Sequence, residues 1–201
     1  MYKIIKRMID LVLSLLATVV LSPVFLVTAA AVKLDSKGPV LFVQKRVGKD
    51  KEHFNMLKFR TMRTDTPHDM PTHLLNDPEA YITKVGKFLR KTSLDELPQL
   101  LNIIKGDMAI VGPRPALWNQ DDLIAERDKY NANSIRPGLT GWAQVNGRDE
   151  LEIDVKAAYD GEYVEKMSPL FDLKCIIKTA LQVVKHEGVV EGGTGTMNSK
   201  G

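Results

Sequence analysis

A run of apolar residues near the start of the chain is its most prominent hydrophobic feature. Residues 11–32 include no charged side chain, and as one continuous helix these 22 residues would be about 33 Å long, enough to cross the core of a bilayer. Ser22 and Pro23 lie at the centre of the run. Proline removes a backbone donor and bends a helix, and the Ser22 hydroxyl can hydrogen-bond a carbonyl that the bend frees. The pattern predicts a membrane helix that is broken at Ser22-Pro23.

Basic residues flank the run at both ends. Lys3, Lys6 and Arg7 precede it, and Lys33 and Lys37 follow it. Because positively charged flanks stay on the cytoplasmic side of a membrane, this arrangement conflicts with a simple spanning helix. The run is also too long for the apolar part of a cleaved signal peptide. The residues leave two interpretations open: a spanning helix with a proline, and a helix that returns to the side from which it entered.

Downstream of the run, short patterns predict a hairpin followed by helices. Residues 40–43 and the alternating segment 53–59 predict two strands, which a turn at residues 48–50 joins into a β-hairpin. Residues 108–111 predict a buried strand or extended segment, whereas residues 136–141 have the Gly and Pro content of a loop. Helical spacing of apolar residues predicts helices near 82–89, from Ser93 to Lys105, over 120–130, over 151–167 and after Pro169.

The order of these segments indicates an α+β fold that is mostly helical. We expect an N-terminal membrane unit over residues 1–36, a main domain over residues 37–187 and a flexible tail over residues 188–201, which is rich in Gly, Thr and Ser.

The helix after Pro169 has an apolar face and a basic face. The apolar face comprises Leu170, Leu173, Ile176, Ile177, Ala180, Leu181 and Val184, and the lysines Lys174, Lys178 and Lys185 lie largely away from it. One interpretation is a helix whose apolar face packs on the core. The other is a helix in a membrane interface, where lysines meet anionic lipid.

Composition restricts the classes of function that the chain can have. The chain of 201 residues is 44% hydrophobic and 26% charged, which is typical of a globular domain. Its net charge of +3, with no zinc-ligand spacing and no strip of stacking aromatics, argues against a nucleic-acid partner. The single cysteine, Cys175, excludes an internal disulfide, and its apolar helical surroundings predict a buried thiol. The four histidines have no spacing that predicts a metal site.

Asp95 and Glu96 are adjacent carboxylates in a basic neighbourhood, the arrangement that phosphoryl-transfer sites need. A carboxylate beside fixed positive charge can act as a nucleophile or a metal ligand while phosphate oxygens are bound. On this interpretation the amides of a helix start lower the pKa of the acid and keep it ionised. The structural alternative is a capping box, Ser93-x-x-Glu96, although Pro98 makes the box irregular. Basic residues precede the pair: Lys84, Lys87, Arg90 and Lys91.

Several arginines and one lysine are candidates for binding phosphate. Arg114 lies between two prolines, which restrict its backbone and orient its guanidinium for bidentate contact. Arg136 and Arg148 stand beside Gly and Pro residues in a similar way. Lys58 and Arg60 are two positions apart, so a strand would direct both to one face.

Six segments together resemble one family, the bacterial monotopic phosphoglycosyl transferases. The resemblance covers about residues 3 to 187. It rests on Lys6-Arg7-x-x-Asp10, Ser22-Pro23, residues 58–62 (KFRTM), 92–100 (TSLDELPQL), 106–115 (GDMAIVGPRP) and 136–148 (RPGLTGWAQVNGR), in this order.

The resemblance implies a small fold in which a helix–break–helix at Ser22-Pro23 re-enters the membrane, and a helix-supported hairpin and amphipathic helices lie on its surface. It implies a location at the bacterial inner membrane, with the catalytic domain on the cytoplasmic face. It also implies a reaction that moves a sugar-1-phosphate from a UDP-sugar to undecaprenyl phosphate and releases UMP. Downstream glycosyltransferases are partners that such a reaction implies. Residues 116–120 resemble those of relatives that act on N-acetylated deoxyamino sugars, which favours a donor of that kind.

The same resemblance assigns roles to residues. Asp95 would be the nucleophile that forms a covalent phosphosugar intermediate, and Glu96 would assist with Mg²⁺ or with the acceptor. Both would contact the metal. Arg114 corresponds to a phosphate-contacting arginine, and we expect Arg90, Lys58, Arg60, Arg136, Gln144 and Arg148 to bind phosphate or substrate. Two other functions use similar parts: a membrane-bound Mg²⁺-dependent phosphatase or pyrophosphatase, and a non-catalytic membrane scaffold.

Overall fold

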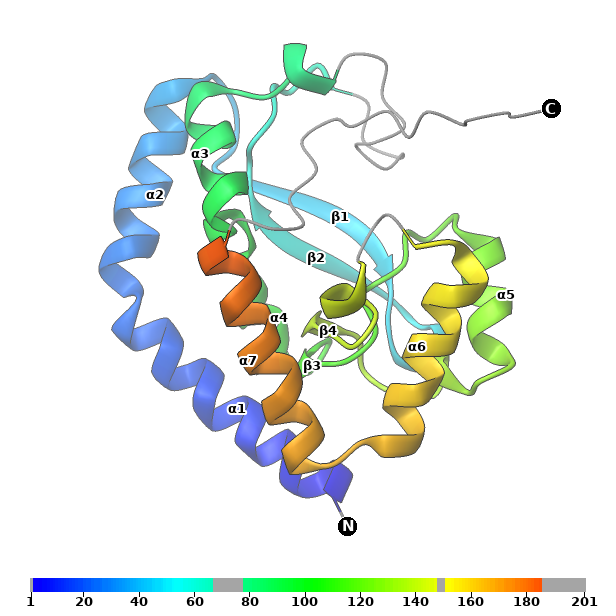
Figure 1. The fold of residues 1–201 in the computed structure, drawn as a ribbon. Coiled ribbons are helices and arrows are strands. Elements are labelled where there is room, and N and C mark those ends of the chain that lie inside the picture. The colour runs from blue at the N-terminus through cyan, green and yellow to red at the C-terminus, as the bar shows by residue number, and fades with distance from the viewer. Residues whose placement is uncertain (1, 67–77, 148–150, 186–201) are drawn as a thin grey trace, which may run out of the picture.

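The chain begins with two helices joined by a sharp bend. A computed structural model describes residues 2–66, 78–147 and 151–185, with the side chains of 184 and 185 excluded. Helix α1 (Tyr2–Val20) and helix α2 (Ser22–Asp35) meet at an angle of 63° and form one edge of the molecule (Figure 1). Pro23 lies in the first turn of α2 and cannot donate to the carbonyl of Val19, so the helix breaks there. The predicted break at Ser22-Pro23 is confirmed.

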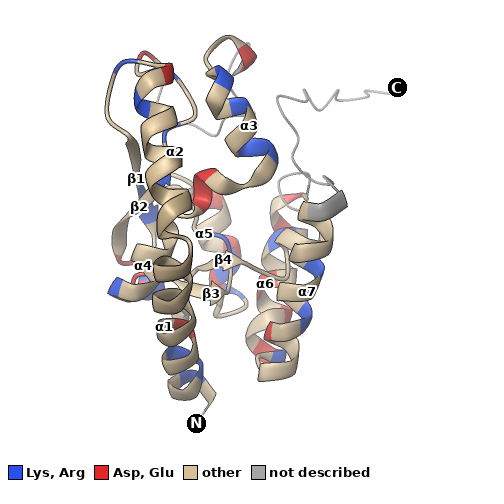
Figure 2. Ribbon diagram, turned by 90° about the vertical axis from the view of Figure 1, so that its left-hand side faces the viewer, with Lys and Arg blue, Asp and Glu red and all other residues tan. Residues whose placement is uncertain are grey.

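Taken singly, none of the helices in the described ranges has the length and apolar content to cross a bilayer, whereas α1 and α2 taken together have both. The charged residues of the pair gather near its two ends, and the middle has none (Figure 2). Many apolar side chains of the pair face outward; Ile4, Val19, Val20, Leu26 and Leu34 are 71–88% exposed. The pair therefore presents an apolar outer surface that the other described residues leave exposed.

A β-hairpin follows. Strands β1 (Leu41–Val47) and β2 (His53–Phe59) pair antiparallel along their whole length, from Leu41 opposite Phe59 to Val47 opposite His53. Opposed residues share a face of the sheet, so Gln44, Arg46 and Lys58 all lie on the face that also carries the buried Met56. Strand β1 is longer than the strand that the apolar run over residues 40–43 predicted. Residues 44–47, which are more polar, also pair with β2.

Short helices connect the hairpin to the second half of the chain. After the turn η3 (Pro78–Ala80), helix α3 (Lys84–Thr92) starts at Thr83, whose side chain accepts from the amide of Gly86. A Cβ atom on Gly86 would lie 2.0 Å from the carbonyl oxygen of Thr61, so glycine allows α3 to approach this backbone closely. The 3₁₀ turn η4 (Leu94–Glu96) and helix α4 (Gln99–Lys105) follow at once.

The second half surrounds a pair of short parallel strands. Strands β3 (Ala109–Val111) and β4 (Gly138–Thr140) pair with each other, although the sequence predicted only a loop for the second of them. Helices α5 (Asp121–Asp128), α6 (Ile153–Lys166) and α7 (Pro169–Lys185), with the turns η5 (Ala132–Ser134) and η6 (Gln144–Asn146), complete the chain. The main cluster of buried residues lies here, around Trp142, Tyr163 and Cys175. Burial raises the pKa of the Cys175 thiol to about 11, and the predicted buried thiol is confirmed.

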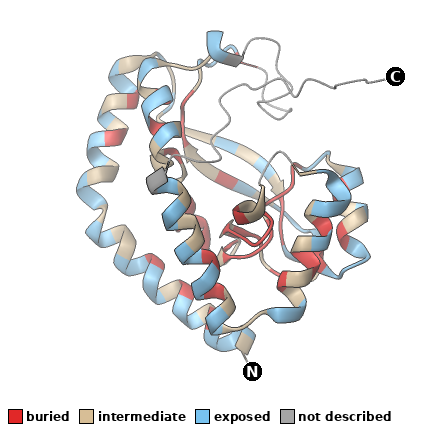
Figure 3. Ribbon diagram, in the orientation of Figure 1, coloured by how far each residue is buried: buried red, intermediate tan, exposed pale blue. Residues whose placement is uncertain are grey.

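Helix α7 turns its predicted apolar face away from the core. Leu170, Leu173, Ile177 and Leu181 are 51–79% exposed, and the outer faces of α1, α2 and α7 are largely exposed in Figure 3. The core side of α7 instead carries Asp172 and Cys175, together with Phe171, which packs on Trp142. The interpretation of a core-facing apolar surface is wrong, because the core here is filled by aromatic side chains and a buried hydrogen-bond network.

Buried polar contacts fix the start of α1 to the rest of the molecule. Lys6 pairs with Asp172 at 2.9 Å and with Asp10 at 3.3 Å, and Tyr2 also donates to Asp172. Arg7 donates to two carbonyls at the end of α4, so it caps that helix. The N-terminal unit over residues 1–36 is thus in contact with the main domain. The predicted tail over residues 188–201 lies outside the described residues.

Candidate functional site

The carboxylate pair lies in the tight turn between α3 and α4. Ser93 has φ 56° and ψ 16°, a left-handed conformation that ends α3 and reverses the chain into η4. The Ser93 side chain makes no capping hydrogen bond, so the capping-box interpretation is wrong. The turn places Asp95, which is 9% exposed, beside strand β2.

Three segments that are distant in sequence bring opposite charges together at Glu96. The Nζ atom of Lys58, from β2, lies 2.7 Å from Glu96 Oε1. The Nη2 atom of Arg114 lies 3.4 Å from the same oxygen. The side chains are only 12% (Glu96), 16% (Lys58) and 26% (Arg114) exposed, so solvent screens these charges weakly. Lys58 and Arg114, which were both predicted to bind phosphate or substrate, thus lie beside the acid pair.

Burial and neighbouring charge act in opposite directions on Asp95. Burial raises the pKa of Asp95 above its ordinary value, while the positive charges of Lys58, Arg90 and Arg114 oppose the increase. The expectation that helix amides lower this pKa is wrong, because the acid lies in a short 3₁₀ turn and is largely desolvated. Burial likewise lowers the pKa of Lys58, and the charge of Glu96 counteracts it.

Arg90 is placed on α3 where it faces the same region. Its Nε donates to the Thr61 hydroxyl at 2.9 Å, which orients the guanidinium. Its charge acts on Asp95 in the direction of a lower pKa. The interpretation of Arg90 as part of the charged site is therefore compatible with its position.

Arg60 and Arg136 lie elsewhere. The Arg60 guanidinium is directed to backbone carbonyls at the end of α2, including Ser36 O at 2.8 Å, rather than to the acid pair. The Nε atom of Arg136 donates to Gly106 O at 2.7 Å, just after α4. The prediction that Arg60 shares a substrate-facing surface with Lys58 is wrong, because β2 ends at Phe59 and carbonyls at the end of a helix are strong acceptors.

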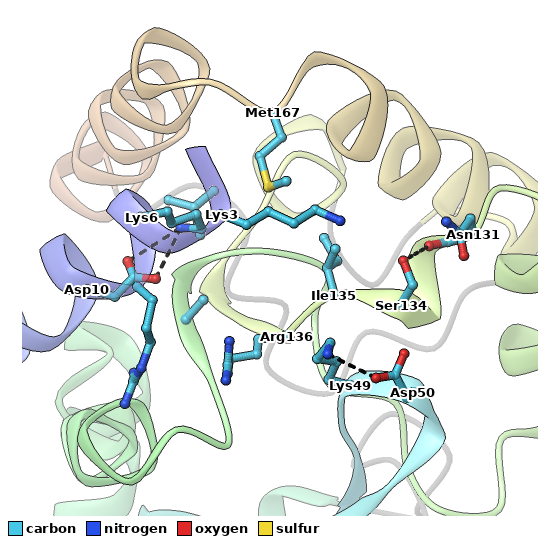
Figure 4. Close-up of a pocket in the computed structure, with 13 residues that line it drawn as sticks. Lys3, Lys6, Asp10, Lys49, Asp50, Asn131, Ser134, Ile135, Arg136 and Met167 are labelled. Atoms are coloured by element: carbon cyan, nitrogen blue, oxygen red, sulfur yellow. Dashed lines mark hydrogen bonds and ion pairs between the residues drawn. The ribbon is translucent and has the colours of Figure 1, made fainter. Parts of the chain in front are cut away.

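Arg136 lines a separate pocket of about 340 Å³ at the N-terminal end of α1. Lys6 and Asp10 are in contact at one side of this pocket, and Lys49 and Asp50 at the other (Figure 4). Several of its charged groups are thus already paired within the protein.

Gln144 and Arg148 complete the set of predicted residues. Gln144 Nε2 donates to Leu139 O at 3.3 Å, and its Oε1 lies near the backbone of Gly141. These contacts of Gln144 are with β4 and the turn after it, and neither involves the carboxylate pair. Arg148 lies outside the described residues.

The loop that carries Arg114 reveals residues that sequence reasoning missed. We call residues 112–117 the arginine loop. Arg46 from β1 donates to Pro115 O at 2.9 Å, and Arg127 from α5 donates to Arg114 O at 3.0 Å. Both arginines stand in ordinary strand or helix patterns, so no local signal distinguished them.

The carboxylates of Asp95 and Glu96 fit a magnesium ion that is held together with substrate phosphates. Mg²⁺ usually takes one or two protein carboxylates and completes its shell with water and phosphate oxygens. Among the described residues there is no group of three or more Asp, Glu, His or Cys side chains that could form a cage for a metal. Asp95 and Glu96 are the residues that would hold such an ion.

Comparison with known proteins gives the family. The bacterial sugar transferase family matches residues 1–186, and the chain belongs to this family and is a transferase. It is 40% identical over 186 residues to the uncharacterized sugar transferase EpsL of Bacillus subtilis, covering 92% of this chain and 90% of the relative.

Two larger relatives have names that specify a reaction. The chain is 40% identical over 194 residues to the UDP-glucose:undecaprenyl-phosphate glucose-1-phosphate transferase of Escherichia coli, covering 90% of this chain. It is 36% identical over 195 residues to the UDP-N-acetylgalactosamine-undecaprenyl-phosphate N-acetylgalactosaminephosphotransferase of Aeromonas hydrophila, covering 93% of this chain. The matched region spans 40% and 45% of the length of these two proteins. Their names specify different sugars and the same acceptor.

Proposed function

We propose that this transferase moves a sugar-1-phosphate from a UDP-sugar to undecaprenyl phosphate and releases UMP. The names of relatives that match almost the whole chain support the reaction class. The observation that carries the proposal is the arrangement of Asp95 and Glu96 beside Lys58 and Arg114. Two carboxylates flanked by fixed cations provide both an attacking oxygen and charge compensation for a diphosphate.

The proposed reaction has two displacements at one phosphorus atom. A carboxylate oxygen of Asp95 attacks the β-phosphorus of the UDP-sugar, the bond from that phosphorus to the bridging oxygen breaks, and UMP leaves with the electron pair. A phosphate oxygen of undecaprenyl phosphate then attacks the same phosphorus and releases the Asp95 carboxylate. A covalent intermediate allows the soluble donor and the lipid acceptor to be bound in turn.

The cations have distinct places in this scheme. Arg114 and Lys58 converge on Glu96, and we infer that their charges also compensate the diphosphate when the donor is bound. Arg90 favours the ionised form of Asp95. Mg²⁺, held by Asp95 and Glu96, would neutralise charge on the phosphate oxygens. We also assign to Glu96 the role of accepting a proton from the acceptor phosphate.

We propose that the protein lies on the cytoplasmic face of the bacterial inner membrane and that α1 and α2 enter and leave the same leaflet. Both ends of the bent pair make polar contacts with the same domain. Lys6 pairs with Asp172 near the start of α1, and Arg60 donates to Ser36 O just after α2. Polar contacts at both ends favour a return over a span, because one compact domain cannot reach both sides of a bilayer.

The test of the proposed function is an Asp95→Asn variant assayed for UMP release with a panel of UDP-sugars, Mg²⁺ and undecaprenyl phosphate. An amide is a poor nucleophile of similar shape, so we expect transfer to fall by roughly a thousandfold or more while the thermal unfolding midpoint stays close to that of the wild type. Asp65→Asn, which changes an exposed aspartate, is the control and should retain full activity.

Intact-protein mass spectrometry checks the intermediate directly. Wild-type protein with donor and Mg²⁺ but without lipid should gain the mass of one phosphosugar, and Asp95→Asn should not. Continued UMP release over many turnovers without lipid would instead identify a hydrolase. An Asp95→Asn variant that keeps both its activity and the phosphosugar adduct would rule out Asp95 as the nucleophile.

A further inference from the structure

The arginine loop is held from two sides by backbone hydrogen bonds. At its start Pro113 O accepts from Gly138 N at 2.8 Å, which ties the loop to the first residue of β4. At its end Pro115 O accepts from Arg46 at 2.9 Å, and the next residue pairs with β1. The residue between these two anchors is Arg114.

The carbonyl of Arg114 has a separate donor. Arg127 Nη2 lies 3.0 Å from this oxygen. The same guanidinium forms an ion pair with Asp160 on α6, with Nε at 2.8 Å and Nη2 at 2.6 Å from Oδ2. The side chains are 5% (Arg127) and 1% (Asp160) exposed, so the pair is the most buried ion pair described in this structure.

A buried ion pair stabilises a contact between helices only after the free energy of desolvating both charges has been offset. The cost of desolvating two charges is often as large as their attraction, and apolar side chains of similar volume can replace such pairs without loss of stability. Apolar side chains cannot, however, donate a hydrogen bond to Arg114 O. A planar guanidinium can contact a carboxylate and a carbonyl at once, and the carboxylate then fixes its orientation.

We propose that Arg127, oriented by Asp160, is a positioning residue that holds the backbone of Arg114 so that the Arg114 guanidinium reaches Glu96 and the donor phosphates. This inference rests on the proposed function of the site. Arg127 acts through the loop and does not touch the substrate. The role assigns a function to α5 and α6, which contribute no other residue to the charged site described above.

The test replaces the pair by apolar residues of similar size, in the double variant Arg127→Met/Asp160→Leu. We expect the unfolding midpoint to stay within a few degrees of the wild type, because apolar residues can replace a buried ion pair. We expect kcat for UMP release to fall by roughly ten- to a hundredfold, with a smaller change in KM, because a small displacement of a group that contacts the substrate slows the reaction. The matched control is Lys51→Met/Asp128→Leu, which removes an exposed ion pair at the end of the same helix. It should keep activity within about twofold.

The discriminating measurement repeats the double variant in an Arg114→Ala background. If the pair acts through Arg114, the further loss there should be less than about twofold. An equal loss in both backgrounds, or no loss in the first, would overturn the proposal. Should the double variant fail to fold, Arg127→Lys serves in the same cycle. It keeps the charge beside Asp160, but a single ammonium does not reproduce the two-sided contact.

Hydrogen exchange provides a readout that does not depend on turnover. Amides of the arginine loop should exchange faster in Arg127→Met/Asp160→Leu than in the wild type, while those of β2, which pairs with β1 and not with the loop, should not change. Unchanged exchange in the loop would contradict the positioning role. A wild-type protein that releases no UMP with any donor would contradict the proposed function instead, so the two failures are distinguishable.

Discussion

At the residue scale, the ionisation of Asp95 depends on a balance that individual side chains can shift. Its burial favours the neutral acid, and three cations favour the carboxylate. The proposed chemistry needs the carboxylate. Because burial raises the pKa of Asp95, we expect the rate to decline, as pH falls, at a higher pH than for an ordinary aspartate.

The effect of Lys58 on this pH dependence can be predicted with its sign. Lys58 is the cation with the largest lowering effect on the pKa of Asp95, followed by Arg90. Lys58→Gln should therefore raise that pKa and move the acidic limb of the kcat/KM profile to higher pH. Arg90→Gln should move it in the same direction by less.

The profile is measured as UMP release across pH with each variant. Lys105→Gln, which changes a lysine that is 71% exposed, is the control and should leave the limb in place. A limb that moves to lower pH in Lys58→Gln would contradict the assignment of the limb to Asp95.

The same scale shows which site residues a sequence can reveal. Asp95, Glu96 and Arg114 were recognisable because adjacent acids and flanking prolines are local signals. The guanidinium groups of Arg60 and Arg136 bind carbonyls that lie 24 and 30 positions away in the chain, and the sequence did not predict these contacts. No local pattern shows which helix end will need a donor. For the same reason, Arg127 went unnoticed although it contacts the site loop directly.

At the element scale, helical periodicity located the helices but did not decide which face is buried. The apolar face of α7 was visible in the sequence, yet the structure turns Leu173 and Ile177 outward and packs Asp172 and Cys175 inward. Strand β4 was missed since Gly138 had the character of a loop residue. A Cβ atom there would lie 2.1 Å from the amide nitrogen of Gly112, so a glycine permits this close strand contact.

The outward face of α7 gives a prediction about membrane depth. If α7 lies in the membrane interface, a nitroxide attached at Leu173→Cys in liposomes should be more accessible to oxygen than to a water-soluble nickel relaxant. The matched position is Val155→Cys, an exposed apolar residue on α6 that should show the opposite preference. Equal access of the nickel reagent to both positions would contradict interfacial placement.

The native thiol should not interfere with this labelling. The pKa of Cys175 is raised to about 11, so at pH 8 roughly one thiol in a thousand is ionised, and the group is also buried. The unsubstituted protein should accordingly react with maleimide only after denaturation.

At the scale of the whole molecule, the bent pair and the main domain form a single assembly. Buried charges join α1 to α7, and Arg7 joins α1 to α4. At the other end, Asp35 accepts from the amide of Val85, which ties the end of α2 to α3. Removing α1 and α2 would leave a buried network without partners, so we regard the bent pair as part of the fold of the main domain and not as a detachable segment.

This connection leads to a topology prediction. Cysteines at Lys3→Cys and Lys37→Cys should both resist a membrane-impermeant maleimide added to intact cells and both react in inside-out vesicles. The physical reason is that residues close to each position make polar contacts with one domain, and such contacts require both ends on the same side. Val155→Cys reports the side of that domain and should match them. Labelling of the two ends from opposite sides would establish a spanning helix. It would also contradict the ion pair between Lys6 and Asp172. A spanning helix would have to break this pair, and two buried charges would then be left without partners.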